Sequence, residues 1–559
     1  MFKQLRKLIL LSLVSILLVP AASFAMIHDP RAIEADPSSA TEAIAPRLAG
    51  LGDHSVTVTT ASADSQYFFN QGLRLTYGFN HSEALRSFKE AIRLDPDNAM
   101  AYWGWALVLG PNLNLPMQAA VAEQAFDAIQ RAMLLREKVS TREQAFIEAL
   151  ATRYAPVAPV DRSSLDRAYA AAMKKLTQTY PDDLDAATLY AAALMNLSPW
   201  NYWFKDGTPH AQTEELIAVL ASVVERDPNH PGALHYHIHA VEAVHPRQGE
   251  SSADALQPLM PGAGHMVHMP SHIYMRVGRY ADAFAANRQA SDADSEYITQ
   301  CNAQGIYPLN YYPHNLHFLV WAAMFQGRSE AALAGAREVQ SKIPVDMQGN
   351  AFGAFETFLA QPLYVMVRFA MWDKALSEPE PAAGNKFMLG VWHYARGMAF
   401  SNTGKERQAK QELRALQALR DDLAPDYLIG FGTAPKLLTI AELLLAADVA
   451  TKAEDYELAL NRLGRAVRVE DSLLYNEPPD WYFPTRHNFG ATLLQAGFPE
   501  EAAVIYWEDL RKNPANGFSL MGLHQAQTAM GDETSAASTK AEFEASWQAA
   551  DVKLSSSRF

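Results

Sequence analysis

The chain has 559 residues and is acidic, since 62 Asp and Glu residues against 47 Lys and Arg residues give a formal net charge of -15 at pH 7. An acidic surface repels phosphate backbones, which argues against a nucleic-acid-binding protein. Cys301 is the only cysteine, so no intramolecular disulfide can form and packing alone must stabilise the fold.

Residues 1–25 have the features of a secretory signal peptide. Basic residues at Lys3, Arg6 and Lys7 precede a leucine-rich stretch, and the small residues around 23–25 are typical of a cleavage site. The apolar run is shorter than the ~20 residues that a membrane span needs. We therefore expect a secreted or periplasmic protein without a stable membrane span.

The rest of the chain divides by its periodicity. Residues 26–60 are small and polar without a regular period, which predicts a flexible lead. Strand signals are rare beyond this point, and helical periodicity runs almost throughout. We divide the helical part into 61–130, a more divergent stretch 131–227, a histidine-rich stretch 228–345 and a C-terminal stretch 346–550.

The window from 66 to 110 carries the clearest internal pattern. Its small residues, aromatic residue and closing proline are Gly72, Ala84, Phe88, Ala91 and Pro96. This pattern resembles the tetratricopeptide repeat family, in which each ~34-residue repeat forms two antiparallel helices. Looser copies place small residues at Ala283, Ala332, Ala409 and Ala502. The resemblance implies an all-α, right-handed superhelical solenoid of about ten helix pairs.

The histidines are not spread evenly over this scaffold. The resemblance implies that five positions in each ~34-residue repeat face the concave groove. Eight of the seventeen histidines take such positions when the repeats are aligned on their Gly, Ala and Pro anchors. They are His235, His239, His265, His268, His272, His314, His317 and His487. Chance would place about two or three there, so the excess indicates a shared site.

Six of these groove residues are candidate metal ligands: His235, His239, Glu242, His265, His268 and His272. The first three are spaced i, i+4 and i+7, and the last three i, i+3 and i+7, so each set follows one face of a helix. Pro270 interrupts the second set. Because proline is tolerated only in the first turn of a helix, His265 and His268 lie either in a helix or in a turn before it.

Imidazole and carboxylate ligands suit zinc, copper, iron or manganese, and copper or zinc is the expected ion. Three ligands with an open fourth position would lower the pKa of a bound water toward ~7. More than four candidate ligands also permit two ions. The residues expected beside the metal or facing a substrate are His314, His317, Arg276, Tyr311 and His487.

The first hypothesis is therefore an exported metalloprotein, with hydrolytic or copper-dependent oxidative chemistry if it is an enzyme. The sequence contains no H-E-x-x-H zinc motif and no nucleophile elbow, so it does not decide whether the protein is an enzyme. The family resemblance supports a second hypothesis, a periplasmic scaffold that binds a peptide, protein or small molecule in its groove. A third hypothesis is metal storage or delivery.

Overall fold

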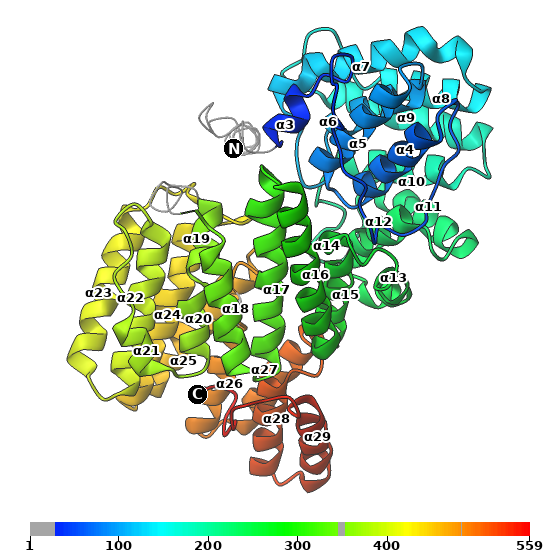
Figure 1. Cartoon of the computed structure of the whole chain (residues 1–559). Helices are drawn as coiled ribbons and strands as arrows, with labels where there is room; N and C mark the ends of the chain where they lie inside the picture. Colours follow the sequence, from blue (N-terminus) through cyan, green and yellow to red (C-terminus); the bar gives the residue numbers. More distant parts are fainter. Residues whose placement is uncertain (1–27, 345–352, 482) are drawn as a thin grey trace, which may run out of the picture. The chain divides into compact units, whose positions relative to one another are not determined.

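The computed structural model describes residues 28–344, 353–481 and 483–559, so the predicted signal peptide lies outside the described residues. In the part of the chain that the structure describes, regular structure is helical (Figure 1) apart from one hairpin, β1 (Leu428–Ile429) with β2 (Gly432–Thr433), and one isolated bridge. This confirms the all-α prediction. None of the described helices combines the length and the apolar character that crossing a bilayer requires.

The chain forms two compact units. The first unit comprises residues up to 244 with 254–267 and 292–311, and the second comprises 245–253, 268–291 and 312–559. The first unit contains α3 (Pro30–Glu34), α4 (Ala63–Tyr77), α5 (His81–Leu94), α6 (Ala99–Leu109), η2 (Ala119–Val121), α7 (Ala122–Leu135), η3 (Arg136–Lys138), α8 (Thr141–Ala151), α9 (Ser163–Thr179), α10 (Leu184–Leu197), α11 (Thr213–Arg226), α12 (Pro231–Val241) and η5 (Tyr307–Tyr311).

Three helices contribute residues to both units: α13 (Glu250–Leu256), α14 (Gly264–His268) and α16 (Tyr280–Cys301). The second unit contains η4 (Pro246–Gly249), α15 (Pro270–Val277), α17 (Tyr312–Phe325), α18 (Ser329–Ser341), α19 (Gly353–Leu359), α20 (Gln361–Arg368), α21 (Trp372–Ser377), α22 (Lys386–Asn402), α23 (Glu406–Asp422), α24 (Ala434–Lys452), α25 (Tyr456–Asp471), α26 (Thr485–Gln495), α27 (Pro499–Lys512), α28 (Gly517–Ala529) and α29 (Glu533–Ser546).

Consecutive helices pack in pairs, and the anchor residues predicted from the sequence explain how closely they approach. Phe88 of α5 is fully buried between α4 and α6. A Cβ atom on Gly72 or Gly104 would lie 2.7 or 2.4 Å from the Phe88 ring, so only glycine fits at either position. The helix α5 ends at Leu94, and Asp95 separates its end from Pro96. This helix end agrees with the one that the proline predicts.

The second unit uses the same arrangement. Tyr506 of α27 is fully buried, and a Cβ atom on Gly490 or Gly522 would lie 2.3 or 2.1 Å from the ring carbon Cζ. The Tyr506 hydroxyl is 2.6 Å from Ser557 Oγ, which fixes the ring. The predicted small residues of the looser copies are all fully buried: Ala283, Ala332, Ala409 and Ala502.

The described part of the predicted flexible lead, residues 28–60, lies along α4 and α5. Backbone amides of this segment donate to side chains of the two helices, for example Leu48 N to Gln71 Oε1 at 2.9 Å and Ile44 N to Glu90 Oε2 at 2.8 Å. The segment therefore has fixed hydrogen-bond partners although it lacks an apolar period. Its predicted mobility stays a prediction.

Two glycine substitutions test the packing of the second unit. In Gly522→Ala the new methyl group would overlap the fixed Tyr506 ring, so we expect the free energy of unfolding to fall by about 1–3 kcal/mol. The matched change Gly464→Ala, inside α25, places its Cβ no closer than 3.6 Å to any atom and should raise that free energy by about 0.5–1 kcal/mol. Urea unfolding monitored by circular dichroism measures both, and equal effects would contradict the close-packing explanation.

Candidate metal centres

Two groups of three histidines bring their ring nitrogens together. The first histidine centre consists of His235, His239 and His265, all in the first unit. The second histidine centre consists of His268, His272 and His314, all in the second unit. In each centre, one nitrogen from every ring lies within 4.8 Å of those of the other two rings. Five of the six predicted ligands are therefore divided between two centres, and His314, predicted beside the metal or facing a substrate, is the third member of the second.

Helical spacing positions these rings as the sequence pattern indicated. His235 and His239 lie one turn apart on α12. Both His265 and His268 are helical, because α14 runs to His268 and Met269 keeps helical backbone angles before α15 begins at Pro270. The proline occupies the first turn of a new helix, where its missing N–H breaks no hydrogen bond.

The first histidine centre is buried, with His235, His239 and His265 only 0, 3 and 3% exposed. The ring centroid of His235 lies 4.9 Å from that of His239 and 5.0 Å from that of His265. The imidazoles thus converge, as predicted, but they lie inside the protein and do not line an open groove. An imidazole in such a place needs a hydrogen-bond partner or a ligand to offset its lost hydration.

The hydrogen bonds at Nδ1 decide the tautomers of this centre. His235 Nδ1 lies 2.6 Å from the Tyr77 carbonyl oxygen, and His239 Nδ1 lies 3.2 Å from Glu242 Oε1. Both partners are acceptors, so each Nδ1 carries the hydrogen and Nε2 of the neutral ring carries the lone pair. Glu242 thus accepts a hydrogen bond from His239, an arrangement that orients metal-binding imidazoles, and its predicted role as a ligand stays a prediction.

Aromatic side chains enclose the first histidine centre. The Phe79 ring lies 4.5 Å from His235 and 5.6 Å from His265, while Trp200 packs its edge on His239 at 5.1 Å. Phe79 and Trp200 both have left-handed backbones, with φ of 55° and 60°. Bulky residues rarely adopt this conformation, and such strain tends to occur at functional sites. Tyr311, predicted beside the site, lies 4.9 Å from His265 between ring centroids.

A hydrogen bond at Nδ1 also decides the tautomer of His268 in the second histidine centre. His268 Nδ1 lies 2.6 Å from Asn287 Oδ1 on α16, and Asn287 Nδ2 donates to the Ala283 carbonyl, which sets the orientation of the amide. His268 Nδ1 therefore carries the hydrogen, and Nε2 of the neutral ring carries the lone pair. His272 Nδ1 lies 3.1 Å from Glu477 Oε2, which makes an ion pair when the ring is protonated.

The Nε2 atoms of His268 and His272 face one another at 2.9 Å. At this distance His272 Nε2 can donate a hydrogen bond to the lone pair of His268 Nε2, and the same approach also suits two imidazoles that bind one cation. With Zn–N bonds of about 2.0–2.1 Å, two ligand nitrogens at angles of 90–110° lie about 2.9–3.4 Å apart. The observed separation of His268 and His272 is therefore compatible with a common ion.

His314 of α17 completes the second histidine centre. Its ring centroid lies 4.9 Å from that of His268 and 5.9 Å from that of His272. Phe318, one turn further along α17, packs against all three rings at 4.5–5.0 Å. His314 is partly exposed whereas the other two histidines are buried, so this centre is accessible from one side.

The remaining predicted residues lie outside both centres. His317 packs on Phe358 at 5.8 Å. His487 has Asp509 Oδ2 2.9 Å from Nε2 and Arg368 Nη2 3.0 Å from Nδ1, so both of its nitrogens are engaged. Arg276 Nε lies 3.7 Å from Glu477 Oε1, which connects it to the carboxylate that faces His272 Nδ1. Its predicted contact with a substrate stays a prediction.

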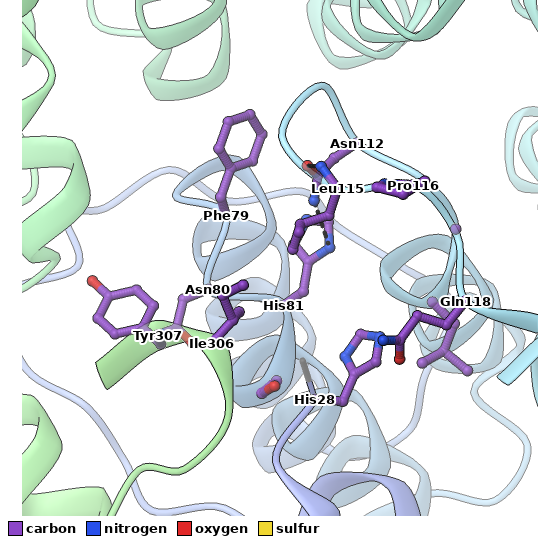
Figure 2. A pocket seen from close by; sticks show the side chains of 13 residues that line it. His28, Phe79, Asn80, His81, Asn112, Leu115, Pro116, Gln118, Ile306 and Tyr307 are labelled. Atoms are coloured by element: carbon purple, nitrogen blue, oxygen red, sulfur yellow. Dashed lines mark hydrogen bonds between the residues drawn. The ribbon is translucent and has the colours of Figure 1, made fainter. Parts of the chain in front are cut away.

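A recess beside the first histidine centre offers only uncharged groups (Figure 2). Phe79 belongs both to its wall and to the first histidine centre. The polar side chains of the recess are those of His28, Asn80, His81, Ser82, Asn112, Gln118 and Tyr307. Burial lowers the pKa of His28 to about 4 and that of His81 to about 3, so both rings are neutral near pH 7. The recess thus suits a small neutral molecule better than an ion.

Three groups that contact Nδ1 atoms of these histidines were not among the residues predicted from the sequence. Asn287, Glu477 and the Tyr77 carbonyl each contact one Nδ1, and Phe318 packs under the second histidine centre. Asn287 lies one turn after the predicted small residue Ala283. This position was the only feature of the nearby sequence that pointed to Asn287. A backbone carbonyl and a glutamate more than two hundred residues away give no signal in the sequence.

No known family model and no curated protein matches the chain. Among solved structures, a human IFIT1 dimer with m7Gppp-AAAA is 12% identical, covering 87% of this chain and 90% of that one, with a TM-score of 0.31. Yeast Tom70 is 11% identical over 85 and 90% (TM-score 0.27), and Cut9–Hcn1 is 12% identical over 87 and 94% (TM-score 0.28). These scores are too low to support an argument, so the fold assignment depends on the helices described above.

Acid sensitivity provides a test of the buried histidines. Burial lowers the pKa of His317 from 6.5 to about 3. Between about pH 3 and 6.5 the His317 ring is therefore protonated in the unfolded chain and neutral in the folded chain. Stability present above pH 6.5 is therefore lost as the pH falls toward 3, at up to ~1.4 kcal/mol per pH unit. His317→Leu should flatten the dependence of unfolding free energy on pH in this window, measured by urea titration. An unchanged slope would contradict the assignment.

Proposed function

We propose that the protein is an exported metalloprotein that binds a transition-metal ion, zinc or copper, at each histidine centre. The observation that carries this proposal is the convergence of three imidazoles at each centre, with His268 Nε2 and His272 Nε2 2.9 Å apart and His268 Nδ1 hydrogen-bonded to Asn287. Imidazole nitrogens with such partners are typical ligands of these ions. The basic start and leucine-rich centre of residues 1–25 support export.

Burial argues against the peptide-scaffold alternative. A peptide in a concave groove would need exposed hydrogen-bonding side chains, yet His235, His239 and His265 are almost fully buried. Phe79 and Trp200 cover their rings. The residues that suggested a binding groove are thus better placed to hold an ion than to contact an extended chain.

The second histidine centre is the better candidate for chemistry. Three imidazoles leave coordination positions open, and the partial exposure of His314 allows a small molecule to approach. An ion bound by three histidines lowers the pKa of a coordinated water toward ~7, which favours hydrolysis at neutral pH. Glu477 connects His272 to Arg276 and thereby places a guanidinium beside this centre.

Metal analysis tests the binding proposal. Protein purified without a histidine tag and reconstituted with Zn²⁺ or Cu²⁺ should retain one ion per centre after dialysis, measured by plasma mass spectrometry. The double change His235→Ala and His239→Ala should remove one ion, and His272→Ala should remove the other. His393→Ala is the control, because that histidine pairs with Glu412 outside both centres and should not alter the content.

The outcomes separate the alternatives. Wild-type protein that retains no transition metal after reconstitution would overturn the proposal. Several weakly held ions, removed by dialysis and insensitive to these substitutions, would instead support the storage hypothesis.

Hydrolysis of 4-nitrophenyl acetate tests the chemistry of the second histidine centre. The zinc-loaded protein should cleave the ester faster than the metal-free protein, with a rate that rises as the pH increases through ~7, because the coordinated water loses its proton there. His272→Ala should reduce the rate to that of the metal-free protein, and His393→Ala should not. Equal rates with and without metal would show that ordinary histidine side chains cause the cleavage.

A further inference from the structure

A second cluster of titratable groups lies beside the first histidine centre. Asp185, near the start of α10, has three potential donors at Oδ1: Tyr77 Oη at 2.6 Å, His54 Nε2 at 2.9 Å and His230 Nε2 at 3.4 Å. We call these four residues the Asp185 cluster. All of them belong to the first unit.

The Asp185 cluster has metal-ligand atoms at suitable distances, but its tautomers favour hydrogen bonding over metal binding. His230 caps α12, and its Nδ1 accepts from the Ala233 backbone N–H at 3.2 Å. The other nitrogen of the neutral ring, Nε2, must therefore carry the hydrogen, and it faces Thr188 Oγ1 and Asp185 Oδ1, each at 3.4 Å. A protonated nitrogen has no lone pair for a metal ion.

Tyr77 connects this cluster to the first histidine centre. It is the last residue of α4; its hydroxyl donates to Asp185, and its backbone carbonyl accepts from His235 Nδ1 at 2.6 Å. Its ring also packs closely on α12, since a Cβ atom on Gly232 would lie 2.5 Å from Tyr77 Cδ1. Tyr77 therefore contacts Asp185 with one group and a ligand histidine with another.

Charge keeps these donor and acceptor roles fixed. Burial alone would raise the pKa of Asp185, but hydrogen bonds from His230 and His54 hold it well below its usual range. Burial and the neighbouring Asp185 carboxylate raise the pKa of Tyr77 well above 10. The carboxylate thus stays charged and the phenol keeps its proton at neutral pH.

We infer that Asp185 is a positioning residue of the first histidine centre. It holds the end of α4 through Tyr77 and the start of α12 through His230, so that the Tyr77 carbonyl meets His235 Nδ1 in the orientation that a metal ligand needs. This inference rests on the proposed metal binding. Loss of partners that orient ligand histidines typically weakens metal affinity by about 10–100-fold.

The test compares metal affinities of the two centres within the full-length chain. A His272→Ala background leaves only the first histidine centre, and a His235→Ala, His239→Ala background leaves only the second. Co²⁺ is titrated into each, and its visible absorption reports both affinity and ligand geometry. Asp185→Asn should weaken binding at the first centre by about 10–100-fold and change its spectrum, without effect on the second.

Two further variants keep the result interpretable. Tyr77→Phe retains the carbonyl and the ring but loses the hydroxyl, so it should also weaken the first histidine centre and not the second. Asp182→Asn makes the same chemical change on a fully exposed carboxylate close by and should alter neither centre.

The possible failures are distinguishable. Absence of Co²⁺ binding in both single-centre backgrounds would overturn the proposed function itself. Normal binding with unchanged affinity and spectrum in Asp185→Asn and Tyr77→Phe would overturn only the positioning role. Equal weakening of both centres would also overturn it, because it would indicate a general loss of stability.

Discussion

A hydrogen-bond acceptor fixed at Nδ1 of a buried imidazole is the interaction on which both histidine centres depend. The Tyr77 carbonyl holds His235 and Asn287 holds His268 in this way. Each acceptor removes the choice of tautomer and turns Nε2 toward the neighbouring rings. Without such an acceptor, a buried imidazole could rotate or adopt the other tautomer. Its Nε2 atom would then not be held toward the neighbouring rings.

The scaffold supplies these acceptors by close packing. Gly232 lets α12 approach Tyr77, just as Gly72 and Gly104 let three helices close around Phe88. Close approach places a backbone carbonyl at the end of α4 within 2.6 Å of a histidine on α12. The close approach that Gly232 allows therefore determines where the His235 ring is held.

The sequence could predict contacts between residues that are close together in the chain, but not contacts between residues that are far apart in it. The pairing of His235 with His239 follows from helical periodicity, because residues four apart lie on one face. The division of His265 and His268 between two centres does not, since the rings that join His265 lie on α12 and those that join His268 lie on α15 and α17. Helical register alone also could not assign His487, whose neighbours Asp509 and Arg368 come from other helices.

The two histidine centres differ in how far their rings are buried. Phe79, Trp200 and Tyr311 enclose the first, and two of these residues adopt strained left-handed backbones to do so. Strain of this kind costs about 1–3 kcal/mol per residue and persists only where the surroundings impose it. At the second centre Phe318 packs against all three rings, and His314 is partly exposed. An ion bound as proposed at the first centre would exchange slowly and stabilise the first unit, whereas one bound at the second would lie beside a partly exposed ring.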